Sequence, residues 1–263
     1  MRKGNLLIMA MIAVLLGVIY ISVVPSPDAP EPATATQTPA APEQALAPAA
    51  EVERYPIAAD SSQTTQPINI EESDSAYGDE LRQLVGAEAL PYFYPDRMIR
   101  RLVATIDNLP RQEAPGRMMP VKPVGGPFLV ERHADRMTID PANDGRYSRY
   151  LDIMAAVDAK RLVDMYISFY PVLQQAYREL GYPRGHFNDR LIDTIDDLLA
   201  TPDLAPPLAV VQPKVLYKFA DPALEKRSAG QKMMLRMGAD NRARAKRLLT
   251  AIRSELLSRS PGA

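Results

Sequence analysis

The sequence predicts a mainly helical (α+β) domain with a small inserted β-hairpin, preceded by one transmembrane helix and a disordered tether. Three observations lead to this fold class. The first is an uncharged run from Leu6 to Val24, and the second is a Pro- and Ala-rich stretch that follows it. The third is the recurrence of apolar residues at helical spacing in the rest of the chain. Together they divide the chain into a cytoplasmic N-terminus (1–5), a transmembrane anchor (6–24), a linker (25–72) and one domain (73–260).

The run from Leu6 to Val24 is long enough to cross a bilayer, whose hydrocarbon core of about 30 Å takes about 20 apolar residues as an α-helix. Arg2 and Lys3 precede this run, and the next basic residue is Arg54. The positive-inside rule therefore places the N-terminus in the cytoplasm and everything after Val24 on the far side of the membrane.

A cleaved secretory signal is the alternative to an anchor. Signal peptides have a shorter apolar core and small residues at the cleavage site, whereas here Pro25 crowds a poor site. The chain has no Cys, which excludes a lipoprotein signal. We favour the uncleaved anchor, and both alternatives export the rest of the chain.

Residues 25–72 consist mostly of Pro, Ala, Thr, Gln and acidic residues. Such a stretch buries too little apolar surface to offset the entropy of ordering it, and its prolines favour extended conformations. We interpret it either as a tether that lets the domain search away from the membrane or as a spacer with no further role.

Apolar periodicity predicts the helices of the domain in order. The first runs from Asp96 to Leu109, between Pro95 and Pro110. The second begins at Asp158 and meets Pro171, which either kinks one helix or starts another that ends at Leu180. The three further predicted helices are one capped by Asn188 and ending before Thr201-Pro202, one from Ser228 to Met237, and one from Asp240 to Leu257.

Strand signals are few. Residues 128–132 and 136–140 flank His133-Ala-Asp135 and predict one short hairpin. Residues 110–127, rich in Pro and Gly, predict a loop.

The sequence contains few of the residue patterns that carry out chemistry. It has no cysteine nucleophile, no Cys/His metal cluster, no His-Glu-x-x-His, no Walker loop and no Gly-x-Ser-x-Gly elbow. Its two histidines are His133, in the predicted hairpin turn, and His186. We expect no cofactor and no metal site.

The densest polar cluster is the loop from Gly181 to Arg190, whose candidate binding residues are Tyr182, Arg184, His186, Asn188, Asp189 and Arg190. If this loop is a functional site, its two arginines and the backbone amides of a helix N-terminus would bind an anion, and His186 and Asp189 would exchange a proton. If the loop has a structural role instead, Asn188 caps the helix, Asp189 complements the helix dipole and Arg190 pairs with a neighbouring acidic residue. We favour the architectural interpretation.

Two charged helix faces follow. The acidic one, which we interpret as solvated rather than as a cation site, comprises Asp189, Asp193, Asp196 and Asp197. The basic one, on the C-terminal helix, comprises Arg242, Arg244, Lys246, Arg247 and Arg253. Such helices bind anionic membranes or acidic proteins, but we favour a solvated packing helix. This helix lacks aromatic residues to stack on bases, so we expect no nucleic-acid partner.

Several motifs occur in one order along residues 75–258, among them Tyr170-Pro-Val-Leu-Gln-Gln-Ala-Tyr177, Phe187-Asn-Asp-Arg-Leu191, Val211-Gln-Pro-Lys-Val-Leu-Tyr217 and Ser228-Ala-Gly-Gln-Lys232. In these the sequence resembles the bacterial domain-of-unknown-function family numbered 3014. The resemblance implies a bacterial, membrane-anchored protein of uncharacterised function, and it assigns no catalytic residue.

The sequence therefore leaves two classes of function. The first is a non-enzymatic binding or scaffold module, held to the bacterial inner membrane by one helix, whose periplasmic domain binds an envelope protein or cell-wall partner. The second is an envelope hydrolase or polysaccharide-active enzyme that uses the loop around His186 and Asp189. The shortage of catalytic residue types favours the first, while carboxylate-only chemistry keeps the second open.

Overall fold

The computed structural model describes residues 52–57, 70, 73–87 and 89–260. The predicted cytoplasmic N-terminus, the anchor over residues 6–24 and most of the predicted linker lie outside these ranges. No helix within the ranges is both long and apolar enough to span a bilayer. The prediction of a mainly helical domain with a minor β component is confirmed for the described part of the chain.

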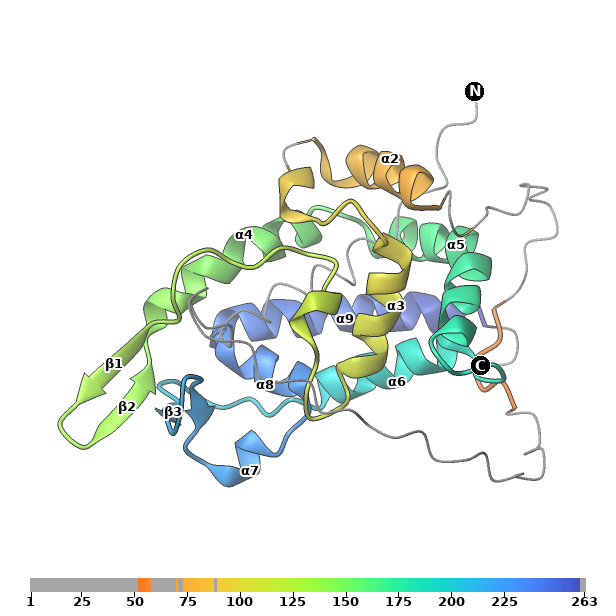
Figure 1. Cartoon of the computed structure of the whole chain (residues 1–263). Coiled ribbons are helices and arrows are strands. Elements are labelled where there is room, and N and C mark those ends of the chain that lie inside the picture. The colour runs from red at the N-terminus through yellow and green to blue at the C-terminus, as the bar shows by residue number, and fades with distance from the viewer. Residues whose placement is uncertain (1–51, 58–69, 71–72, 88, 261–263) are drawn as a thin grey trace, which may run out of the picture.

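Helices make up most of the domain (Figure 1). The α-helices of the described residues are α2 (Ser73–Val85), α3 (Met98–Asn108), α4 (Asp144–Ala155), α5 (Ala159–Glu179), α6 (Phe187–Leu199), α7 (Pro222–Glu225), α8 (Ala229–Arg236) and α9 (Ala239–Ser258). Three of them, α5, α7 and α8, have the side-chain N-caps that their sequences favour, and in α7 the Asp221 carboxylate accepts from the Ala223 N–H. The Asp158 carboxylate accepts hydrogen bonds from the backbone N–H groups of Lys160 and Arg161 at the start of α5. The Ser228 hydroxyl accepts one from Gln231 N–H at the start of α8.

The strands form one antiparallel sheet of order β1-β2-β3-β4, which projects from one end of the helical body (Figure 1). Its members are β1 (Val130–His133), β2 (Arg136–Ile139), β3 (Ala209–Val211) and β4 (Lys218–Phe219). The predicted hairpin is confirmed as β1 and β2, but the expectation that it stands alone is wrong. β3 and β4 are too short to show the alternation that identifies a strand in a sequence.

Helix α9 is the centre of the main core. It contacts α4, α5, α6 and α8, and Figure 1 shows it running through the middle of the helical body. Its buried apolar residues, Ala245, Leu249, Ile252 and Leu256, follow helical spacing. A second, smaller core joins the sheet to α8 through Ile139, Val210, Phe219 and Leu235.

Proline does not divide α5. The helix continues through Pro171, so the alternative of two separate helices is wrong, and the ribbon changes direction along its length (Figure 1). Helices α2, α4 and α7 were not among the predicted elements. In α4 the signal was present, because Tyr147, Tyr150, Leu151 and Met154 are buried at helical spacing.

Candidate functional site

The polar loop that follows α5 is fixed by one buried side chain, Gln174. Its amide N–H donates to the Gly185 carbonyl at 2.8 Å, and its oxygen accepts from the Phe187 N–H at 2.8 Å. Gly185 packs closely on an aromatic ring, because a Cβ there would lie 3.0 Å from Cε1 of Tyr177. These contacts determine where α6 begins.

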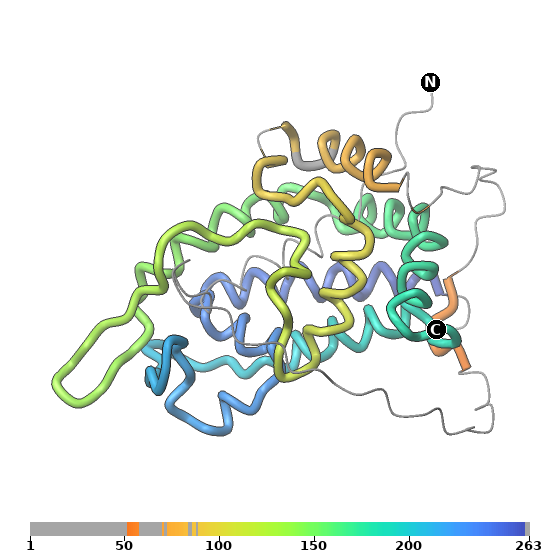
Figure 2. Tube along the Cα trace, in the orientation of Figure 1, coloured from red at the N-terminus to blue at the C-terminus, as the bar shows by residue number. Residues whose placement is uncertain are grey.

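Residues 53–57 lie against the N-terminal end of α6, and we call them the docked segment. Figure 2 shows them in orange at the end of the molecule away from the sheet. Within the docked segment, Tyr55 and Ile57 pack against the main core. A stretch of the predicted linker is thus in contact with the domain.

Asn188 joins α6 to the docked segment. Its amide N–H donates to the Tyr55 carbonyl at 2.7 Å, and its oxygen accepts from the Tyr166 hydroxyl at 2.9 Å. The prediction that Asn188 caps the helix is wrong, because α6 starts at Phe187 with His186 in the N-cap position and no side-chain cap. Asn188 is 1% exposed, and its amide instead satisfies the buried Tyr166 hydroxyl and the part-buried Tyr55 carbonyl.

Asp189 binds the backbone of the docked segment. Its Oδ2 accepts from the Arg54 N–H at 3.0 Å, and its Oδ1 accepts from the Tyr55 N–H at 2.9 Å. The carboxylate lies in the first turn of α6, where the helix dipole favours negative charge. Both of its oxygens therefore hold main-chain groups from a segment 134 or 135 residues earlier in the sequence.

The side chain of Arg54 meets the acidic face of α6. Its Nη2 donates to Oδ2 of Asp193 at 2.6 Å, its Nε lies 3.7 Å from Oδ2 of Asp189, and its guanidinium lies 5.5 Å from the Tyr55 ring centroid. The hydrogen bond to Asp193 raises the pKa of Arg54, which burial opposes. The pair with Asp193 is exposed to solvent, so its strength will fall with salt.

Two further contacts hold the ends of the docked segment. Glu53 Oε1 lies 3.5 Å from Nδ1 of His186, and the Ser260 hydroxyl donates to the Pro56 carbonyl at 2.7 Å. Burial, followed by the charge of Glu53, raises the pKa of Tyr170 to about 12. The segment therefore bridges the start of α6 and the end of α9.

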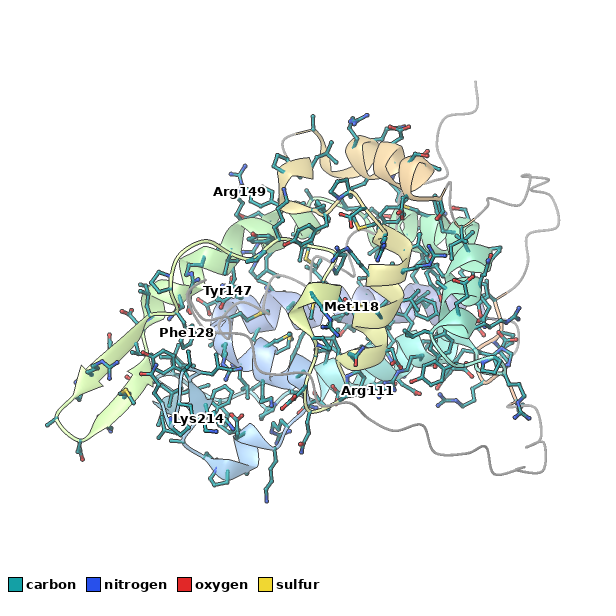
Figure 3. The ribbon with its side chains drawn as sticks, viewed as in Figure 1. Arg111, Met118, Phe128, Tyr147, Arg149 and Lys214 are labelled. Atoms are coloured by element: carbon teal, nitrogen blue, oxygen red, sulfur yellow. The ribbon has the colours of Figure 1, made fainter. Side chains whose placement is uncertain are left out.

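A buried carboxylate on α3 organises the other side of the loop. Asp107 is 4% exposed and accepts from Arg190 Nε at 3.1 Å, from Arg111 Nη2 at 2.7 Å and from the Tyr182 hydroxyl at 3.2 Å. Arg111, labelled in Figure 3, also donates to the Tyr182 oxygen at 2.5 Å. Burial lowers the pKa of Arg111, but the charges of Asp107 and Tyr182 outweigh it and raise the pKa overall.

The six candidate residues thus fall into separate groups. His186, Asn188 and Asp189 contact the docked segment, while Tyr182 and Arg190 contact Asp107. Arg184 is exposed and makes no hydrogen bond or ion pair to the described residues. Asp107 and the docked segment were missed. For the segment a signal existed, because residues 51–57 (Glu-Val-Glu-Arg-Tyr-Pro-Ile) are more charged and aromatic than the rest of the linker.

The acidic face of α6 is not simply solvated, as the sequence suggested. Asp196 pairs with Arg253 on α9 at 2.5 Å. Asp197 is half-buried, and its carboxylate accepts from the Ser228 hydroxyl at 2.6 Å and the Gln231 amide at 3.0 Å. Most carboxylates on this face therefore connect α6 to its neighbours.

The basic face of α9 also differs from the prediction of a solvated helix. Arg242 is 3% exposed and donates to the Leu204 carbonyl at 2.7 Å. Lys246 donates to Asp203 at 2.9 Å, and Arg244 pairs with Asp152 at 2.6 Å. Much of this positive charge is balanced within the domain.

A hollow of about 410 Å³ opens beside the docked segment. Its lining is Val52, Arg54, Tyr177, His186, Asp189, Arg190 and Asp193. Within the described part of the chain, no group of three or more His, Cys, Asp or Glu side chains is placed to hold a metal ion. The arrangement is suited to binding charged and main-chain groups.

One comparison with known proteins gives a match. The profile of a family described as "Protein of unknown function (DUF3014)" matches residues 98–253, which cover α3 to most of α9. Neither the curated proteins nor the solved structures gave a match. The family profile covers more than half of the chain, and the protein belongs to the DUF3014 family.

Proposed function

We propose that this protein is a single-pass protein of the bacterial cytoplasmic membrane and that its helical domain is a non-enzymatic binding module in the periplasm. The anchor is the uncharged run from Leu6 to Val24, and the orientation follows from Arg2 and Lys3. The partner is an envelope protein or a cell-wall component.

The observation that supports a binding role is the way in which α6 holds the docked segment. Asp189 and Asn188 bind main-chain N–H and C=O groups, while Asp193 binds a side chain. A general acid or base must be able to exchange a proton with a substrate. Both oxygens of Asp189 already accept hydrogen bonds from main-chain N–H groups, so the geometry favours binding over hydrolysis.

Two reporter fusions after Ala263 test the location. A reporter that is active only in the cytoplasm should be inactive, and one that is active only after export should be active. The opposite pattern would contradict the proposed orientation. Deletion of residues 6–24 should release the protein from the membrane fraction and keep it in the cytoplasm, because this run is both the anchor and the export signal.

Site-specific photocrosslinking in intact cells tests the binding role. A photoreactive residue at Arg184, which is exposed beside the site, should give a discrete crosslinked species. The same residue at Lys214, at the sheet end of the molecule (Figure 3), serves as the control and should give none. Absence of any adduct at position 184 would argue against a partner at this face.

A further inference from the structure

The docked segment is recognised largely through its main chain. Asp189 accepts from two consecutive N–H groups, those of Arg54 and Tyr55. Asn188 donates to the Tyr55 carbonyl, and Ser260 donates to the Pro56 carbonyl. Two consecutive N–H groups reach one carboxylate only where the backbone turns, and Arg54 and Tyr55 lie in a bend. These main-chain contacts therefore select a bent peptide backbone and depend little on its side chains.

Side-chain contacts add selectivity to this recognition. The guanidinium of Arg54 lies between Asp193 and Asp189, both of which select a basic residue. Tyr55, the next residue, packs against the main core. The side-chain contacts therefore favour a peptide in which a basic residue is followed by an aromatic one.

Proline at position 56 restricts the conformation of the residue before it. The helical region of φ/ψ space is disfavoured for a residue that precedes proline, so Tyr55 has fewer backbone conformations available before it docks. Less conformational entropy is then lost on binding. Pro56, the fourth residue of the recognised sequence Glu53-Arg-Tyr-Pro56, thus contributes to binding by restricting the backbone.

We infer that the N-terminal end of α6 is a receptor for a bent peptide with a basic residue, an aromatic residue and proline in succession, and that the docked segment occupies it in cis in place of a partner peptide. This inference rests on the binding role proposed above and specifies the partner of that same site. The docked segment and α2 are joined by a short connection, so the segment has an effective concentration in the millimolar range at its own site. A partner peptide must compete with this occupant.

The test uses the full chain and a fluorescent peptide spanning residues 50–58, with binding followed by anisotropy. In one variant, R54A/Y55A, the cis occupant loses its side-chain contacts. This variant should bind the peptide at least about tenfold more tightly than the wild type, because competition at millimolar effective concentration is weakened. A peptide with Arg54→Ala and Tyr55→Ala keeps the main-chain groups but lacks the side-chain contacts, so it should bind the same variant more weakly than the parent peptide does.

Two further variants protect the result from a folding artefact. Arg54→Ala alone leaves Tyr55 packed on the core and should give an intermediate gain in affinity. Adding Asp189→Ala to the R54A/Y55A chain should abolish peptide binding. Circular dichroism should show the same helical content in each chain that is compared.

Absence of saturable binding to both R54A/Y55A and Arg54→Ala would overturn the inference, as would equal affinity for the wild type and both variants. The reporter fusions and the crosslinking at Arg184 do not depend on this peptide. Peptide binding can therefore fail while the proposed function holds, and the two failures are distinguishable.

Discussion

The side-chain amide of Asn188 donates to the backbone carbonyl of Tyr55 at 2.7 Å, across 133 residues of sequence. The oxygen of the same amide accepts a hydrogen bond from the hydroxyl of the fully buried Tyr166. One side chain in the first turn of α6 therefore satisfies a core hydroxyl and fixes the docked segment. These two hydrogen bonds explain why an asparagine stands at position 188, two residues after the N-cap position of α6.

Asn188→Ala should destabilise the domain by about 1–3 kcal/mol, because it leaves the buried Tyr166 hydroxyl without its acceptor. The free energy of unfolding from urea denaturation measures this loss. The matched control is Asn108→Ala, which removes a bond to the Ala104 carbonyl within α3 and leaves no second buried group unsatisfied. Equal losses in the two variants would mean that Asn188 has no bridging role.

Asp107→Asn should cost about 3 kcal/mol of stability, because it removes a buried charge that balances Arg190 and Arg111. Asp152→Asn is the control, since Asp152 pairs with Arg244 at the surface and should cost no more than about 1 kcal/mol. Thermal or urea denaturation distinguishes the two. A loss for Asp107→Asn as small as the control would show that the buried pairs contribute little.

The helices of the core could be predicted because each presents one apolar stripe to a neighbour. In α9, Ala245, Leu249, Ile252 and Leu256 show the periodicity and are all buried. β3 and β4 could not be predicted, because strands of two or three residues owe their existence to pairing with β2 and with each other. The continuous helix through Pro171 reflects tertiary packing that outweighs a local preference.

The candidate loop could be located from its polar composition, but its contacts could not. The partner of Arg190 is Asp107, 83 residues away on α3, and the partners of Asp189 lie in the predicted linker. Helical spacing indicates which face of α6 is apolar. It does not indicate which segment, distant in the sequence, packs against the N-terminal end of this helix. The cap role given to Asn188 failed for this reason.

The carboxyl of Asp144 should make the stability of the domain depend on pH. Burial, and then the charge of Asp240, raise the pKa of this carboxyl, while Arg242 lowers it. A carboxyl whose pKa is raised on folding contributes stability below its ordinary pKa of about 4, and this contribution is lost as pH rises through the raised value. Asp144→Asn does not ionise, so its stability relative to the wild type should increase as pH rises from about 4 to 7.

Urea denaturation of both chains across this pH range provides the measurement. Asp240→Asn is the matched control, because removing its charge should reduce the pH dependence without removing the titrating carboxyl. A difference between Asp144→Asn and the wild type that stays constant with pH, or that falls as pH rises, would refute the assignment.

Residues 53–57 dock on α6 through the carboxylate of Asp189. Residue-resolved hydrogen exchange on the full chain tests this contact most directly, because the backbone N–H groups of Arg54 and Tyr55 are the donors to that carboxylate. Both amides should exchange much more slowly than in a free peptide, and Asp189→Ala should remove the protection at both while the core of α9 stays protected. Exchange of Arg54 and Tyr55 at free-peptide rates in the wild-type chain would show that the segment does not dock on α6.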